Sequence, residues 1–232
     1  MIDVGGFATH IDHKEKCGGG ETAPTPPPAG DGMDFMEIIR GRRSVRAFRP
    51  DPPSREQIEQ IIEAARWAPS PHGRQPWRFV VITRAELKSR LADAMGVEWR
   101  AQLSLDGQDA DTISLRHRKS QERIIGAPVI ILPCLYLEDL DIYPDADRQA
   151  AETTMAIQSL GCAVQNMLLA AYALGLDSGW MCAPLFSPEA VRAALDLAPS
   201  MHPHALIPLG YAAKDPVRRP RRPLDELVVR WE

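Results

Sequence analysis

No run of apolar residues in this 232-residue chain approaches the ~20 residues that a helix needs to cross a bilayer. The first residues also lack the positively charged start and the apolar stretch of a secretory signal. The four cysteines are far apart and form no CxxC pair, so the sequence indicates neither a disulfide framework nor a metal site. We therefore expect a cytoplasmic protein with no membrane segment.

Several motifs of common enzyme classes are missing as well. The chain contains no GxGxxG, GxxxxGK[ST], GxSxG or HExxH sequence, which disfavours the corresponding dinucleotide, P-loop, hydrolase and zinc-protease sites. Aromatic residues make up only 6% of the chain and its net charge is −4. A nucleic-acid-binding surface usually combines stacking side chains with a basic excess, so we expect no nucleic-acid partner.

What is present is the composition of one globular domain. Apolar types account for 44% of the residues and charged types for 25%, enough to build a buried core. From Gly18 to Gly32, nine of fifteen residues are Gly or Pro, so we expect residues 1–32 to form a flexible tail and residues 33–232 to form the folded domain. His10, His13 and Cys17 in this tail are weak metal candidates, and a solvated leader is the favoured interpretation.

Positive charge is concentrated in two short segments of an otherwise acidic chain. Residues 40–49 and 214–222 together hold ten of the 27 basic residues but only one of the 31 acidic ones. Arginine side chains recognise phosphate and carboxylate with two parallel hydrogen bonds. The segments therefore favour a small anion as the ligand, and a solvated arginine-rich turn is the competing interpretation of the first one.

Capping residues and hydrophobic spacing predict helices and strands in alternation along residues 34–136. We expect a helix capped by Asp34 and Glu37, then a helix capped by Ser54 and Gln57, and then a strand at 78–83. A helix opened by Thr83 with Glu86 follows, and after it a helical stretch at 96–125 with Trp99, Leu103, Ile113 and Leu115 facing inward. A strand at 128–136 ends this part of the chain. Pro133 predicts an edge position or a bulge for the last strand.

The second half of the chain begins with an unusually long predicted helix over residues 145–174, which ends at Gly175. Small and apolar residues occupy more than one face of this helix, so a partner subunit is expected to cover it. A strand at 178–183, a helix capped by Ser187 with Pro188 next to it, and a strand at 205–211 follow. Strands separated by helices of varied length give an α+β fold.

Four segments, taken together, resemble the flavin-binding nitroreductase family. In chain order they are RRSVR at 42–46, PSPHGRQPW at 69–77, LGLDSGW at 174–180 and RPRRP at 219–223. The ordered set is specific, and the resemblance covers about residues 33–232. Between Met95 and Trp180 the chain looks most like the nitroreductase-like domain of the bifunctional enzyme that completes the deazaflavin coenzyme. That enzyme's glutamate ligase domain is missing here, so we expect a free-standing reductase domain.

The resemblance implies a mixed, mostly antiparallel sheet flanked by helices, with the long helix at a homodimer interface. It also implies an FMN site. The arginines would reach the phosphate and the polar edge of the flavin, Pro69 and Ser70 would line its ring, and main chain around Met181 would approach flavin N5. Gly73 departs from the Asn that many members contribute across the dimer. The implied cofactor-binding residues are Arg42, Arg43, Ser44, Arg46, Pro69, Ser70, Gly73, Met181, Cys182, Arg219 and Arg221.

The flavin itself carries out hydride transfer, so the protein has to bind and orient it rather than supply a nucleophile. The implied activity is an FMN-dependent oxidoreductase acting on a small molecule, with NAD(P)H as the candidate reductant and a dehydro precursor of the deazaflavin coenzyme as the narrower substrate. A general nitro or quinone reductase and a non-catalytic flavin-binding protein stay open. Candidate substrate residues are His72, Arg74, Arg78, Trp99 and Arg100, with Arg116 and Arg118 as further cations.

Two other side chains near the implied flavin allow two interpretations each. His72 is a candidate proton donor, although an isolated loop histidine more often only forms hydrogen bonds. Cys182 is a candidate modulator of the flavin, and packing in a buried position is the favoured interpretation.

Overall fold

The computed structural model describes residues 34–216 and 220–232. The expected tail, with its metal candidates His10, His13 and Cys17, and the implied phosphate ligand Arg219 lie outside these residues. Among the described residues no helix is both long and apolar enough to span a bilayer. In the same part of the chain, no three His, Cys, Asp or Glu side chains are grouped so that they could hold a metal ion.

The first two helices begin where their capping residues predicted. Helix α1 (Phe35–Gly41) has a capping box made by Asp34 and Glu37, and helix α2 (Arg55–Arg66) has one made by Ser54 and Gln57. Each box satisfies main-chain N–H groups that the first helical turn leaves without partners. Helix α2 buries Ile58, Ile61 and Ala65.

Five strands form one sheet in the order β1, β2, β5 and β3, with β4 paired to β2 beyond the end of β5. All pairs of named strands are antiparallel. Besides these pairs, an isolated parallel bridge joins Ser44 to Ser178. The strands are β1 (Trp77–Ile82), β2 (Val129–Tyr136), β3 (Asp177–Ser178), β4 (Met201–Pro203) and β5 (Ile207–Gly210).

The prediction that Pro133 marks an edge or a bulge is wrong, because β2 is the central strand. On one side it pairs with β1 along its length, with Pro133 opposite Phe79. On the other side, β5 pairs up to Ile131 and β4 begins at Cys134. The carbonyl oxygen of Pro133 accepts from His204 N at 3.0 Å on this second side. The ring nitrogen, which lacks a hydrogen, therefore faces the junction between two partner strands, where no ladder bond is lost.

Strand β2 is buried on both faces and divides the core in two. Ile131 and Leu135 pack with α2 and with the long helix α5 (Ala146–Ala173), which cover one face of the sheet. Ile130, Leu132 and Cys134 point the other way, toward α3 (Ala85–Leu105) and α6 (Pro188–Leu195). The alternation follows from the two-residue period of a strand.

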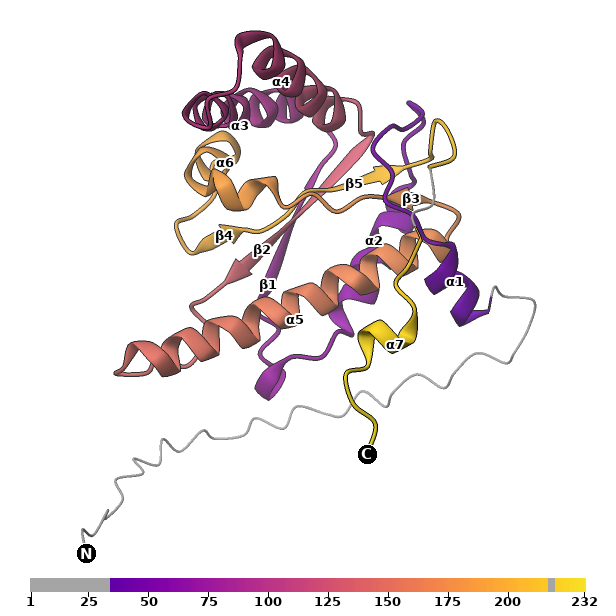
Figure 1. Ribbon diagram of the computed structural model, residues 1–232, viewed down its shortest axis with the longest axis vertical. Helices are drawn as coiled ribbons and strands as arrows, with labels where there is room; N and C mark the ends of the chain where they lie inside the picture. Colours follow the sequence, from indigo (N-terminus) through magenta and orange to yellow (C-terminus); the bar gives the residue numbers. More distant parts are fainter. Residues whose placement is uncertain (1–33, 217–219) are drawn as a thin grey trace, which may run out of the picture. The chain divides into compact units, whose positions relative to one another are not determined.

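The predicted helical stretch at 96–125 is in fact the end of α3 followed by a separate helix, α4 (Ala110–Ile125). These two helices pack against each other as a hairpin, at the top of Figure 1. Leu103 is buried, but Leu115 is 41% exposed, so its inward assignment is wrong. Helix α3 begins after Arg84 without a side-chain cap, so the expected role of Thr83 is wrong as well.

Helix α5 matches its predicted span and ends as predicted at Gly175. The N–H groups of Gly175 and Leu176 donate to the carbonyl oxygens of Tyr172 and Ala171, and Gly175 has a φ of 75°. This is the Schellman ending, which favours glycine because other residues are strained at positive φ. The short elements η1 (Pro71–Gly73), η2 (Ala183–Phe186) and α7 (Leu224–Leu227) complete the fold.

Candidate flavin site

The arginine-rich segment is fixed to the end of the sheet by its main chain. Val45 N donates to the carbonyl oxygen of Ser178 at 2.9 Å, and Ser44 forms the parallel bridge to Ser178. Val45 is buried, whereas Ser44 and Arg46 are exposed on the opposite side of the extended chain. The alternation of side chains in an extended segment therefore presents the hydroxyl and a guanidinium together.

Arg42 is half-buried, and its Nε is buried with no hydrogen-bond partner. Its pKa is lowered, first by burial and then by the nearby positive charges of Arg221 and Arg43. Within the described residues neither Arg42 nor Arg221 has a carboxylate to compensate this charge. A buried donor beside a second guanidinium is costly unless an anion accepts from it. The arrangement therefore fits a phosphate group.

Arg43 is held by main-chain carbonyl groups next to Arg42. Its Nη1 donates to the carbonyl oxygens of Arg40 and Arg42, each at 2.7 Å. These are carbonyl groups at the end of α1, which have no partner within the helix. In this structure the guanidinium closes the helix end and sits beside the phosphate ligands.

The loop after β3 offers main-chain donors. Met181 exchanges two hydrogen bonds with Leu206, at 3.0 and 2.8 Å, so its own N–H is already used. The N–H groups of Cys182 and Ala183 have no main-chain acceptor among the described residues. These two N–H groups are consequently available to donate to a ligand. The side chain of Cys182 is exposed, which makes its favoured assignment to a packed, buried position wrong.

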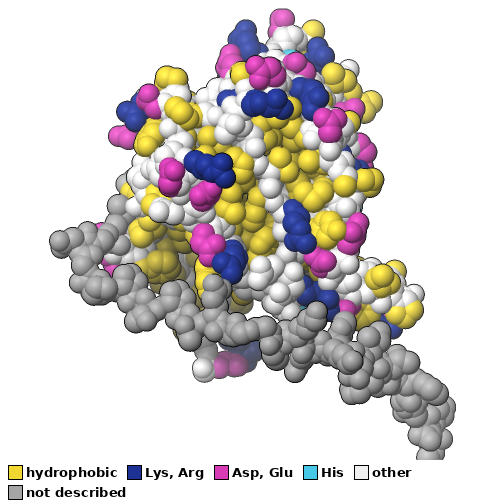
Figure 2. Space-filling view, turned by 180° about the vertical axis from the view of Figure 1, so that it is seen from behind, with side chains coloured by type: hydrophobic (Ala, Val, Ile, Leu, Met, Phe, Trp, Pro, Cys, Tyr) yellow, Lys and Arg dark blue, Asp and Glu magenta, His cyan; other side chains and the backbone are white. Residues whose placement is uncertain are grey.

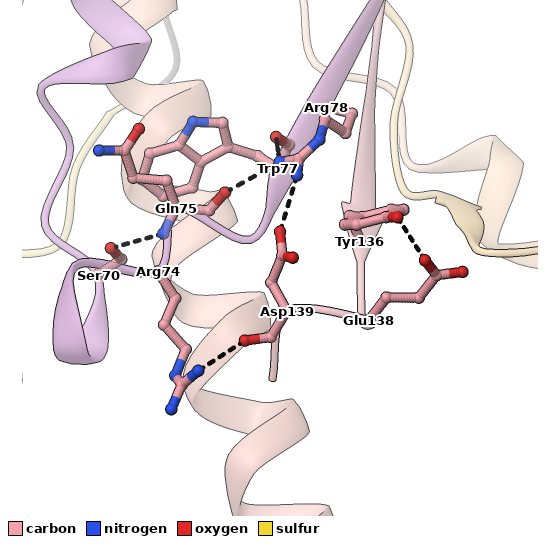
Figure 3. A network of polar contacts seen from close by, with 8 residues as sticks. All are labelled: Ser70, Arg74, Gln75, Trp77, Arg78, Tyr136, Glu138 and Asp139. Atoms are coloured by element: carbon pink, nitrogen blue, oxygen red, sulfur yellow. Dashed lines mark hydrogen bonds and ion pairs between the residues drawn. The ribbon is translucent and has the colours of Figure 1, made fainter. Parts of the chain in front are cut away.

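The implied ring-lining loop at residues 69–76 is a strained turn held by polar contacts (Figure 3). His72, Gly73 and Gln75 have φ angles of 54°, 64° and 51°, in the left-handed region that favours glycine. Ser70 Oγ accepts from Gln75 N at 3.1 Å and spans the turn. His72 is exposed and forms no hydrogen bond within the described chain.

Two of the expected substrate cations instead hold this loop in place. Arg74 donates to the carbonyl oxygen of Asp139 at 2.8 Å and pairs with Asp141 at 2.5 Å. Arg78 pairs with Asp139 at 2.7 Å and lies 4.4 Å from the centre of the Tyr136 ring (Figure 3). Their charges are compensated within the chain by these carboxylates, and their assignment to a substrate site stays a prediction.

One chain does not bring the two parts of the implied site together. Ser178 pairs with Leu209 of β5, which lies opposite Val129 at the beginning of β2. The 69–76 loop precedes Trp77, which pairs with Leu135 near the other end of β2. Six residues of strand span roughly 20 Å. Figure 1 shows the arginine segment and the loop at η1 at opposite ends of the sheet.

A cavity of about 360 Å³ lies between the α3–α4 hairpin and residues 180–187. Of the expected substrate residues and further cations, Trp99 and Arg116 line this cavity and Arg100 and Arg118 do not. Sequence reasoning missed Lys119 and Arg123, which share one helical face with Arg116 and could have been found from this spacing. A second cavity of about 480 Å³ shares Arg46, Lys119 and Arg123 with the first.

Residues 39–211 match the model of the nitroreductase family, and the chain belongs to this family. A putative nitroreductase from Desulfovibrio desulfuricans in complex with FMN is 31% identical, with a TM-score of 0.66 over 87% of this chain and 99% of that one. An FMN-dependent nitroreductase from Mycobacterium smegmatis in complex with NADPH is 26% identical, with a TM-score of 0.66 over 85% of this chain and 97% of that one.

A curated sequence relative, a putative NADH dehydrogenase/NAD(P)H nitroreductase of Methanothermobacter thermautotrophicus, is 28% identical over 81% of this chain and 82% of its own length. The predicted fold and the prediction of an enzyme of the nitroreductase family are confirmed by these likenesses. The narrower resemblance to the deazaflavin biosynthesis enzyme stays a prediction.

Proposed function

We propose that this chain is an FMN-dependent oxidoreductase of the cytoplasm that takes a hydride from NAD(P)H and passes it to a small aromatic acceptor such as a nitro compound or a quinone. The observation that carries the proposal is the buried, unpartnered Nε of Arg42 beside Arg221, at the sheet end where Cys182 and Ala183 offer free N–H groups. Membership of the nitroreductase family, whose solved members include FMN and NADPH complexes, supports it.

Different residues of the chain would bind the phosphate, the polar edge and the N5 side of FMN. Arg42 and Arg221 would hold the phosphate, with Arg219 as a further ligand from the family pattern. Ser44 and Arg46 would meet the polar edge of the ring, and an N–H from Cys182 or Ala183 would orient its N5 side. Bound FMN supplies the hydride chemistry, while fixed cations and N–H groups favour the negative charge that a reduced flavin carries.

We propose further that the enzyme works as a homodimer, because Pro69 and Ser70 lie about the length of β2 from the arginine segment of the same chain. A second copy would bring its own loop to the first copy's arginines. Large apolar side chains are exposed on α1, α5 and the C-terminal segment, including Phe35 at 63%, Ile157 at 43% and Trp231 at 85%. Exposed apolar surface of this extent marks interaction sites.

The visible spectrum tests the cofactor directly. Purified protein titrated with FMN should bind one flavin per chain and become reduced when NADH or NADPH is added without oxygen. No stoichiometric binding would contradict the proposal. Bound flavin that passes no electrons to any acceptor would identify the non-catalytic flavin-binding protein instead. Turnover with nitroaromatics, quinones and the dehydro precursor of the deazaflavin coenzyme would rank the candidate substrates.

A mixing experiment tests the shared site. Arg42→Gln damages the phosphate half and Ser70→Trp blocks the ring half, so each variant alone should bind little FMN. Refolding them together in equal amounts should restore about a quarter of the wild-type sites, because half of the dimers are mixed and each contains one intact site. No recovery from correctly folded mixed dimers would show that both halves belong to one chain.

A further inference from the structure

The cavity between the α3–α4 hairpin and residues 180–187 combines an apolar lining with unpaired positive charge. Trp99, Trp180, Met95, Met181 and Phe186 supply flat or flexible apolar surface. Arg46, Arg116, Lys119 and Arg123 supply four cations, against the single carboxylate of Glu98. Within residues 34–216 and 220–232, none of these four cations has an ion-pair or hydrogen-bond partner.

Unpaired cations crowded along one wall repel one another, and an anionic ligand would relieve that repulsion. The spacing of Arg116, Lys119 and Arg123 places all three on one face of α4. Arg118 on the same helix pairs with Glu122 and lies outside both cavities, so the unpaired charge is confined to the lining face. Arg46, Lys119 and Arg123 also line the second cavity, together with Lys214 and the carboxylate of Glu122.

Helix α3, which packs beside α4 in the hairpin, carries a second unsatisfied group. Trp99 Nε1 is buried and has no hydrogen-bond partner among the described residues. An indole N–H can only donate, so this residue of the cavity lining carries a donor that has no acceptor in the described chain. Trp180 is partly exposed at the cavity, and indole rings stack well on other flat rings.

We propose that this cavity is a specificity pocket for a flat aromatic ligand that carries an anionic group, with Lys119, Arg123 and Arg116 as the residues that recognise the anion. The proposal rests on the proposed function, because Met181 and Arg46 join the pocket to the candidate flavin site. The anionic group has two candidate sources. One is a carboxylate or phosphate on the electron acceptor, and the other is the phosphates of the pyridine nucleotide donor.

A charge-matched pair of acceptors tests the inference. We would compare 4-nitrobenzoate with its neutral counterpart 4-nitrobenzamide in the wild type, in Lys119→Gln/Arg123→Gln and in the control Arg118→Gln. The double variant should raise the KM for 4-nitrobenzoate by about tenfold or more and leave that for 4-nitrobenzamide nearly unchanged, since a hydrogen bond to a charged group is lost only for the anion. Arg118→Gln should change neither constant.

The KM for NADH and NADPH, measured separately in the same variants, distinguishes the two sources. A rise confined to the nucleotide would support the pocket and identify the donor as its anion. The inference would be overturned if the KM of the double variant rose equally for the neutral and the charged acceptor, or did not rise for any anion, while the enzyme still reduced its flavin. In that case the proposed function stands.

A binding measurement without turnover keeps the test independent of the flavin. Nitroaromatic rings quench tryptophan fluorescence, and Trp99 and Trp180 both line the pocket. In protein without FMN, 4-nitrobenzoate should quench more strongly than 4-nitrobenzamide, and Trp99→Phe should remove part of this effect. Quenching that is identical for the two compounds and unaffected by Lys119→Gln/Arg123→Gln would also overturn the inference.

Discussion

Gly179 lies directly against the main chain of Val45: a Cβ atom at position 179 would be 2.5 Å from the carbonyl oxygen of Val45. That oxygen is part of main chain and cannot swing away as the end of a side chain could. The absence of a side chain therefore lets the arginine segment lie flat on the end of the sheet. The adjacent hydrogen bond from Val45 N to Ser178 O depends on the same approach.

Gly179→Ala should weaken both folding and flavin binding. The added methyl group must push the two main chains apart, and overpacking of this kind typically costs about 1–3 kcal/mol. Because the displaced segment contains Ser44 and Arg46, FMN affinity should fall together with the free energy of unfolding. Urea denaturation of the flavin-free protein and an FMN titration measure the two effects.

Gly175→Ala provides the matched control four residues earlier. A Cβ at Gly175 meets nothing within 4 Å, but its φ of 75° strains any other residue. We expect a stability loss of about 1 kcal/mol from this strain and an unchanged FMN affinity. Equal loss of FMN binding in both glycine variants would contradict a local role for the Gly179 contact.

Arg42→Met should separate ligand binding from folding. The change removes a buried donor that has no partner and relieves repulsion by Arg221 and Arg43, so the flavin-free protein should be as stable as the wild type or more stable. FMN affinity should fall by about tenfold or more, since a charge-assisted bond to phosphate is lost.

Arg43→Met should lower the stability of the flavin-free protein and affect FMN binding less. Its guanidinium satisfies two carbonyl groups at the end of α1, so its loss should lower the stability of the flavin-free protein by about 1 kcal/mol. Its effect on FMN affinity should be smaller than that of Arg42→Met. Parallel losses in both variants would show that the two arginines share one role.

His204 should make the protein less stable in mild acid. Its pKa is lowered by burial and, to a lesser degree, by the charge of His202. Below the ordinary histidine pKa of about 6.5, the His204 side chain binds a proton in the unfolded chain but stays neutral in the folded chain. The free energy of unfolding should thus fall by up to about 1.4 kcal/mol for each pH unit, from about 6.5 down to the lowered folded pKa.

Urea denaturation at pH 7.5 and pH 5.5 measures this dependence. His204→Asn should reduce the difference in stability between the two pH values. His72→Asn should leave that difference as it is, because His72 is exposed. A wild type whose stability is the same at both pH values would contradict the prediction.

Lys88 should contribute to stability despite its burial. Its Nζ donates to the carbonyl oxygens of Ala127 and Pro128, at 2.6 and 3.3 Å, where α4 gives way to β2. Burial lowers its pKa, and Lys88→Met would leave two carbonyl groups without this donor. We expect a loss of about 1–3 kcal/mol in urea denaturation. Arg100→Met, an exposed change on the same helix, should cost far less.

Local signals predicted the helix starts and the span of α5, because capping boxes and the glycine ending act over a few residues. Asp34 with Glu37 and Ser54 with Gln57 are recognisable from the sequence alone. The position of Pro133 was predicted wrongly because it depends on contacts between residues that are distant in sequence. Whether its missing N–H matters depends on where two strands distant in sequence meet beside it, and the sequence contains no local sign of that junction.

The site was predictable to the extent that it follows the family's motifs. Arg42 and Ser44 lie at one end of the sheet with the loop that follows β3, and their role in flavin binding stays a prediction. The ion pairs of Arg74 and Arg78 depend on Asp139 and Asp141, which are more than sixty residues away, so the sequence contains no local sign of these pairs. Arg116, Lys119 and Arg123 required knowing that α4 is a separate helix with one face on a cavity.

The α3–α4 hairpin occupies the whole connection between β1 and β2, which pair with each other directly. Hairpin residues that line the cavity and lie outside the core, such as Lys119 and Arg123, can change in kind without shifting the register of the sheet or moving Ser44 and Ser178. The hairpin side chains that line the cavity can therefore vary, in evolution or by engineering, while the sheet stays the same. Diversity among close homologues of this chain should accumulate in the hairpin first, and directed libraries for new acceptors should start there.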